Sequence, residues 1–186
     1  MITHKPMPQY VDRALGKVGH DYMEFFVNLN PILIFVLTPI VAAATRKANV
    51  YRMMVLGTFV MAAPTFLLAI APSIWLLLAY LVIMSVGEAM WQPRFLQYAA
   101  EIAPPGRTGA YMGVAQLPWF LTKMITGLYA GWFLMNYCPE PGKGEQDTTT
   151  MWLVYACIAM LSTVMLVLAR NWIGRDFKTK IGRAHV

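Results

Sequence analysis

Five apolar stretches of about twenty residues dominate the sequence and constrain its fold more than any other feature. They cover approximately residues 22–45, 51–71, 73–93, 109–136 and 151–170. A helix needs about 20 predominantly apolar residues to cross a hydrocarbon core about 30 Å thick. The stretches show no strand-like alternation, and a helix satisfies its own backbone hydrogen bonds in lipid. The sequence therefore predicts an all-α, polytopic transmembrane helix bundle with five spans.

Composition agrees with a membrane protein, because 58% of the 186 residues are hydrophobic and only 13% are charged, which is outside ordinary soluble usage. We expect residues 22–170 to form the bundle, preceded by an exterior loop or helix end at residues 1–21. The first twenty residues are polar and lack the apolar core of a cleavable signal peptide. Residues 171–180 are expected to be a cytoplasmic tail. The last six residues, IGRAHV, resemble a translated sequencing adapter and are expected to be an artefact.

The net charge of +6 is distributed as in a membrane protein rather than a nucleic-acid-binding one. If loops alternate between sides, nine Lys and Arg residues share one side and four the other. The larger set is Arg46, Lys47, Arg52, Arg94, Arg107, Arg170, Arg175, Lys178 and Lys180. Cytoplasmic loops carry such an excess. The sequence thus predicts an integral protein of the inner or plasma membrane with a cytoplasmic C-terminus, whose partner is the lipid bilayer and not nucleic acid.

Motifs of catalysis are absent from the sequence. His4, His20 and His185 are scattered, and there is no Gly-rich phosphate loop or nucleophile elbow. Cys138 in a polar loop and Cys157 in the last span should differ in depth, so a disulfide between them is not expected. We therefore expect neither an enzyme nor a bound metal or cofactor.

The third apolar stretch carries a carboxylate where an ionised side chain is costly. Ser85, Glu88 and Gln92 fall within about 60° of one another on a helix, forming one polar stripe flanked by Trp91. A charge at a helix centre costs about 2.5–3.5 kcal/mol. Such a helix should face protein or a water-filled cavity rather than lipid.

A second stripe, formed by Gln116, Trp119 and Lys123, has the same spacing on the next span. Glu88 and Lys123 both lie roughly ten residues from the same membrane face, near the bilayer middle. We therefore expect them to pair. The pair can act as a proton-coupling or gating salt bridge, or it can be purely a structural latch between helices.

The first span offers two asparagines, only one of which can line a cavity. Asn30 points about 160° away from Asn28, which shares a face with Glu24. Pro31 and Pro39 lie in the same span, and each removes a backbone donor and bends the helix. Bent helices carrying polar groups are typical of a transporter's moving gate, although curvature around a core would also explain them.

Four segments resemble a known family. NLNPILIFVLTPIVAA at 28–43, SVGEAMWQP at 85–93, APPGRTGAYMG at 103–113 and WFLTKMITGLYAG at 119–131 are similar to the C-terminal half of major facilitator superfamily transporters. They are most similar to the proton-dependent oligopeptide transporters. The resemblance implies that the chain is a partial twelve-helix fold, comprising helices 8 to 12.

The resemblance also implies functional residues. In that family the tenth-helix Glu contacts the substrate's amino terminus, the eighth-helix Asn holds its polar backbone and the eleventh-helix Trp lines the pocket; these positions are Glu88, Asn30 and Trp119. The polar stripes add Gln92 and Gln116 to the predicted substrate-binding residues. Lys123 departs from the family, which has a small or apolar residue there, and the spacing from residues 112–113 to Trp119 is longer.

The resemblance implies secondary active transport of a small solute, proton-coupled and peptide-like, by alternating access. In that mechanism one half rocks against the other, so the N-terminal half, the solute and protons are expected partners. Two alternatives stay open: a non-transporting five-helix scaffold or assembly partner, and a carrier of organic anions or sugars, which Lys123 would suit. The reading frame upstream of Met1 distinguishes the scaffold from the carrier, since only the carrier needs seven more spans there.

Overall fold

The structure, a computed structural model, describes residues 6–140, 142 and 144–170, and the expected tail and adapter-like end lie outside them. Helices and their connections make up this part of the chain, which confirms the all-α prediction. The helices are α1 (Pro6–Ala14), α2 (Gly16–Asp21), α3 (Met23–Ala44), α4 (Val50–Ala62), α5 (Thr65–Ile70), α6 (Ile74–Ile102), α7 (Thr108–Tyr137) and α8 (Thr148–Leu168).

Within the described residues, four helical segments are long and apolar enough to cross a membrane. They are Met23–Ala44, Val50–Ile70, Ile74–Ile102 and Thr148–Leu168. The remaining expected span, residues 109–136, corresponds to α7, a single helix of 30 residues. It is long enough, but polar residues such as Gln116 and Lys123 keep its mean hydropathy below that of the other four.

Prolines shape the helices in two ways. Pro64 separates α4 from α5, because proline lacks the N–H that would continue the helical ladder. Pro31, Pro39, Pro93 and Pro118 instead lie inside continuous helices. As a result α6 continues past Pro93 to Ile102, beyond the expected end of the third span.

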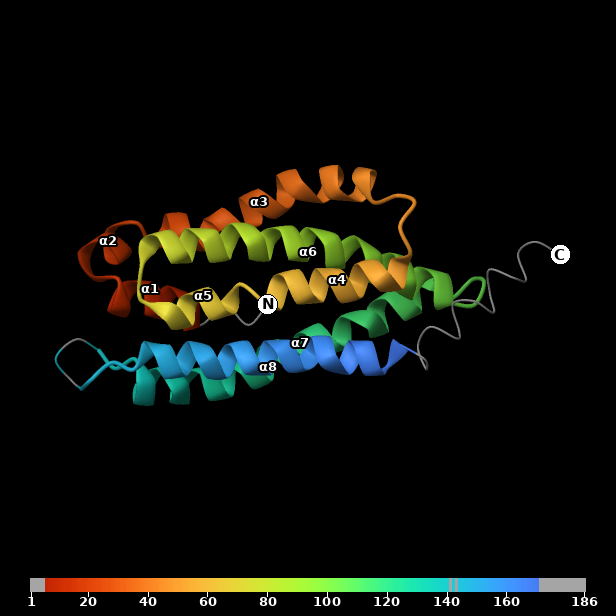
Figure 1. Ribbon diagram of the computed structural model, residues 1–186. Helices are drawn as coiled ribbons and strands as arrows, with labels where there is room; N and C mark the ends of the chain where they lie inside the picture. Colours follow the sequence, from red (N-terminus) through yellow and green to blue (C-terminus); the bar gives the residue numbers. More distant parts are fainter. Residues whose placement is uncertain (1–5, 141, 143, 171–186) are drawn as a thin grey trace.

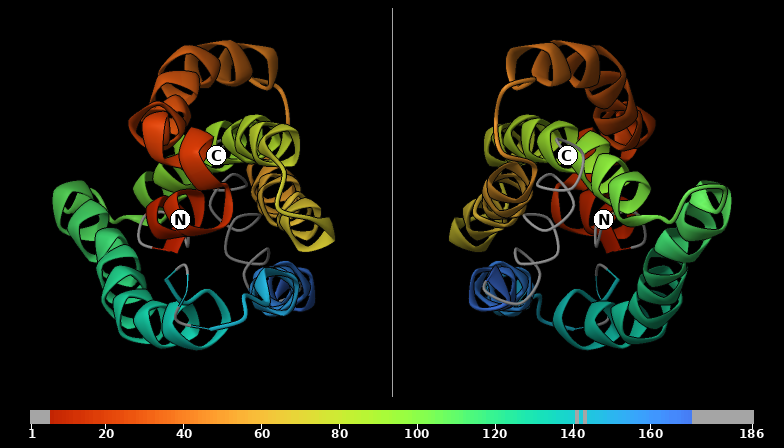
Figure 2. Two further views of the ribbon diagram at one scale, coloured as in Figure 1. Left: turned by 90° about the vertical axis from the view of Figure 1, so that its left-hand side faces the viewer. Right: turned by 90° about the vertical axis from the view of Figure 1, so that its right-hand side faces the viewer.

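The long helix α6 is the centre of the bundle. It packs against α3 on one side and against α4 on another, while α4 and α5 pack against α8 (Figure 1). The helix α7 crosses the bundle at an angle, so that its first half lies toward α6 and its last half toward α8 (Figure 2). This arrangement leaves much of α7 exposed.

The contact between α4 and α6 is unusually close because glycines face each other across it. A Cβ atom added at Gly87 would lie 2.5 Å from the backbone nitrogen of Met61 and 2.9 Å from the carbonyl oxygen of Gly57. Only a residue without a side chain allows the two backbones to approach this far. Glu88 is therefore carried on a helix whose position is fixed by backbone contact.

The apolar core lies at the end of the bundle where α1 packs, here called the α1 end. Tyr10 of α1 and Trp152 of α8 are fully buried, with ring centroids 5.0 Å apart in an edge-to-face arrangement. Tyr80 of α6 packs on the same indole. Such aromatic pairs contribute about 0.5–1.5 kcal/mol beyond area burial, so α1 is an integral part of this core.

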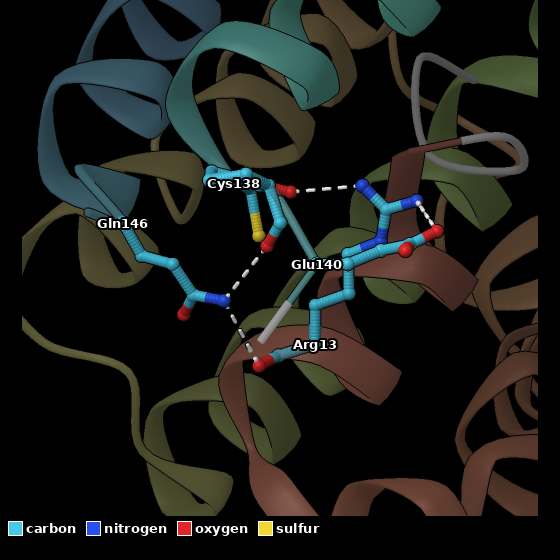
Figure 3. A network of polar contacts seen from close by, with 5 residues as sticks. Arg13, Cys138, Glu140 and Gln146 are labelled. Carbon is cyan, nitrogen blue, oxygen red and sulfur yellow. Dashed lines mark hydrogen bonds and ion pairs between the residues drawn. The ribbon is translucent and has the colours of Figure 1, made fainter. Parts of the chain in front are cut away.

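A polar network holds α1 to the loop between α7 and α8 (Figure 3). Arg13 donates to the carbonyl oxygen of Cys138 over 2.9 Å and lies 3.8 Å from the Glu140 carboxylate. Gln146 donates to the carbonyl oxygens of Arg13 and Pro139. The network closes the loop over Cys138, which is buried, whereas Cys157 is exposed. Both thiols are free, as expected.

We expect Arg13→Gln to speed the reaction of Cys138 with a water-soluble maleimide several-fold in a Cys157→Ala background. Burial raises the pKa of the Cys138 thiol, and the Arg13 guanidinium lowers it by a smaller amount. The thiolate is the reactive form. Opening the loop exposes the thiol and removes the effect of burial, which is the larger of the two. The pKa of Cys138 should therefore fall and the labelling rate rise, although the guanidinium of Arg13 is lost. Lys17→Gln at the same end is the control; equal rates in both variants would contradict a closing role for Arg13.

Candidate functional site

The site is centred on the Glu88 carboxylate, which α6 holds against α3. Glu88 is 7% exposed and Asn30 is 5% exposed. Asn30 donates through Nδ2 to one carboxylate oxygen over 3.3 Å. Gln92, one turn further along α6, donates through Nε2 to the other oxygen over 3.2 Å. The carboxylate thus receives one amide donor from its own helix and one from the neighbouring helix.

Ser85 sets the orientation of the Asn30 amide. Its Oγ lies 2.6 Å from Asn30 Oδ1 and 2.7 Å from the carbonyl oxygen of Leu81, so its single hydrogen serves two acceptors. Because a hydroxyl donor faces Oδ1, the amide nitrogen of Asn30 must face the carboxylate. Ser85 is fully buried, which protects this arrangement from water.

The expected ion pair between Glu88 and Lys123 is not formed. Ion pairs are seen in the described part of the chain between Arg13 and Glu140 and between His20 and Asp12, but none joins Glu88 to Lys123, which is exposed. The reason is the orientation of α7, which turns Trp119 and Thr122 toward α6 and leaves Lys123 beside that face. Similar depth along two helices was not enough to bring the charges together.

A cavity of about 290 Å³ opens beside Glu88, between α6 and α7. Met61 of α4 also lines it, together with Trp91, Phe95, Pro118, Trp119 and Thr122. Trp91 stacks on Trp119 of α7, with centroids 6.0 Å apart and planes inclined by 17°, and on Phe95 at 4.7 Å. The cavity therefore offers an apolar, aromatic wall and a single carboxylate, which suits a small ligand with one polar end.

Two further polar residues weighed from the sequence, the predicted Gln116 and the alternative Asn28, do not line this cavity. Gln116 is exposed on α7 and is not among the lining residues. Asn28 is also exposed, and its side chain donates to the carbonyl oxygen of Glu24 on its own helix. The structure thus places Asn30, and not Asn28, beside Glu88.

Sequence reasoning missed Phe95, Met61 and Thr122 as lining residues. Phe95 could have been found, since it follows Glu88 by seven residues and Trp91 by four, and both spacings keep side chains on one helix face. Met61 had no such signal, because it reaches the cavity only through the close contact of α4 with α6.

Arg94, which the sequence indicates only as one of the cytoplasmic basic residues, connects α6 to α3 in the structure. It is 7% exposed and donates to the carbonyl oxygen and, over 2.9 Å, to the hydroxyl of Thr45 at the end of α3. It also donates to Gln97 over 2.7 Å. These hydrogen bonds join the end of α3 to α6, the two helices that carry Asn30 and Glu88.

The chain was compared with protein families, curated proteins and solved structures. The sequence model of the Major Facilitator Superfamily matches residues 7–182, a range that includes every residue of the site. No curated protein and no solved structure matches the chain. Since the family match extends over nearly all of the sequence, and the helices are those of a membrane protein, the chain belongs to the Major Facilitator Superfamily, whose members carry solutes across membranes.

Proposed function

We propose that this chain is the C-terminal portion, helices 8 to 12, of a proton-coupled transporter that binds the ammonium group of a small, peptide-like solute at Glu88. The observation that carries the proposal is a buried carboxylate at a cavity wall that has neutral amide donors but no cationic partner in the described residues. A charge in this position is costly unless it is paired.

The geometry leaves the carboxylate able to accept more hydrogen bonds. An ionised carboxylate has about four acceptor sites, and Asn30 and Gln92 each use one. An ammonium group entering the cavity would supply both further donors and the compensating charge. Hydrogen bonds between charged groups are roughly twice as strong as neutral ones.

The aromatic wall suits the rest of such a solute. Trp91, Phe95 and Trp119 present ring faces that can pack against an apolar side chain or attract a cation. Lys123 does not line the cavity, so the ionisable group that faces the solute is the carboxyl group of Glu88 and not a lysine ammonium. This favours an amine-bearing solute over the organic anions that Lys123 alone would suit.

In the proposed cycle a proton and the solute ammonium compete for Glu88. A protonated carboxyl carries no charge and has a hydroxyl donor in place of one acceptor, so Asn30 or Gln92 must turn away from it. Because Asn30 belongs to α3 and Gln92 to α6, protonation would change the contact between these helices. This contact would shift as the two halves of the carrier rock in alternating access.

Competition for uptake tests the solute class. In proteoliposomes containing the complete carrier, a dipeptide with a free amino terminus should inhibit uptake about 10- to 150-fold more strongly than its N-acetylated form, the range for losing one charged hydrogen bond. The acetylated peptide keeps the side chains and the carboxyl terminus, so it is a matched control. Equal inhibition by both would contradict recognition of an ammonium group.

A further inference from the structure

A second cavity, independent of the solute site, lies on the outside of the bundle between α4 and α8. Its volume is about 410 Å³. Val55, Leu56, Phe59 and Val167 form an apolar wall, and two arginines, Arg52 and Arg170, lie at one end of it. We call this cavity the α4–α8 groove.

The groove is built between helices that are fixed to each other. The hydroxyl of Tyr51, in the first turn of α4, donates to the carbonyl oxygen of Leu166, near the end of α8. The two helices run in opposite directions, so the start of α4 and the end of α8 meet at one end of the bundle (Figure 1). The arginines therefore lie where an apolar helix pair leaves the hydrocarbon region and reaches headgroups.

Among the residues that the structure describes, no ion pair is formed by the arginines of the groove. The side chains of Arg52 and Arg170 are both exposed. Deeper in the groove, the hydroxyl of Thr163 is buried and has no hydrogen-bond partner. Arg46 and Lys47, in the turn before α4, are exposed as well, but they do not line the groove.

From this geometry we propose that the α4–α8 groove binds an anionic phospholipid. Its phosphate lies between Arg52 and Arg170, and one acyl chain follows Val55, Leu56 and Phe59. The two arginines at one end of the groove are complementary to an anionic headgroup, and its apolar wall is complementary to a hydrocarbon chain. A packed protein helix would suit the site less well, because it would bury two unpaired arginines. A basic cluster beside an apolar helix pair is the expected pattern for such lipids.

Native mass spectrometry of the purified chain tests the proposal. With phosphatidylglycerol and phosphatidylcholine of identical acyl chains, the chain should retain one phosphatidylglycerol preferentially. The double variant Arg52→Gln, Arg170→Gln should bind phosphatidylglycerol about thirty-fold more weakly, as expected for two arginines near a charged headgroup. Arg46→Gln with Lys47→Gln removes the same charge from outside the groove and is the matched control. Equal retention of both lipids, or an equal loss in the control, would overturn the proposal.

Two further measurements separate a lipid site from a simple anion site. Val55→Trp fills the groove without changing its charge, and should also weaken phosphatidylglycerol binding. Thermal unfolding in detergent micelles shows whether each variant remains folded. Glycerol 3-phosphate, the headgroup chemistry without acyl chains, should not displace the bound lipid. Displacement by glycerol 3-phosphate, or full binding by a folded Val55→Trp variant, would contradict a phospholipid site.

Discussion

Glu88→Gln is expected to lower the kcat/KM for uptake of an amine-bearing solute by about 10- to 150-fold, the value of one hydrogen bond to a charged group. The remaining uptake should no longer depend on the proton gradient, because a glutamine amide, unlike a carboxylate, does not bind or release a proton near neutral pH. Glutamine also presents an NH2 group where the carboxylate accepts from both Asn30 and Gln92. One of the two contacts then becomes donor against donor, which disturbs the cluster further. Uptake by the complete carrier in proteoliposomes, with and without an imposed pH gradient, measures both effects.

Glu24→Gln is the matched control for this experiment. Glu24 is the same residue type on the neighbouring helix α3, but it is exposed near the start of that helix. Its replacement should leave uptake and its proton dependence unchanged. If Glu88→Gln retained full proton-driven uptake, Glu88 would have no coupling role, while the family membership and the fold would be unaffected.

Gly87→Ala is expected to lower the free energy of unfolding by about 1–3 kcal/mol, the usual cost of adding a group to a close-packed contact. The new methyl group would meet Met61 and Gly57 backbone atoms at 2.5 and 2.9 Å, which cannot turn aside as a flexible side chain could. The helices α4 and α6 must then separate. Since Glu88 is the next residue, the variant should also weaken solute binding. Thermal unfolding of the purified chain in detergent measures the first effect.

Gly131→Ala makes the same chemical change where there is room for it. A Cβ atom at Gly131 of α7 would meet nothing within 4 Å. This control should be neutral or more stable, since alanine favours a helix over glycine by about 1 kcal/mol. Equal stability of the two variants would mean that the α4–α6 contact is looser than its geometry indicates.

The helices and the centre of the site could be predicted from the sequence, because both depend on local patterns. Apolar runs of the right length specify membrane helices, and the spacing of Ser85, Glu88 and Gln92 places three polar groups on one face. The choice of Asn30 over Asn28 depends on the family resemblance, since the helical wheel alone favours Asn28 if Glu24 faces inward. The structure sets Asn30 against Glu88.

The position of Lys123 could not be predicted from the sequence. A helical wheel gives the direction of a side chain relative to its own helix, but not the tilt of that helix against its neighbour. Here α7 crosses the bundle obliquely (Figure 2), and Trp119 and Thr122 reach the cavity while Lys123 stays exposed. Met61 is a similar case, because its place in the cavity depends on how closely two glycines allow α4 and α6 to approach.

The stacked indoles of Trp91 and Trp119 have a spectroscopic consequence. They belong to α6 and α7, and their centroids are 6.0 Å apart, close enough for their electronic transitions to couple. Any change in the separation of these helices alters that coupling, and with it the near-ultraviolet circular dichroism. The two indoles thus report on movement between α6 and α7 at the wall of the cavity, without an attached dye.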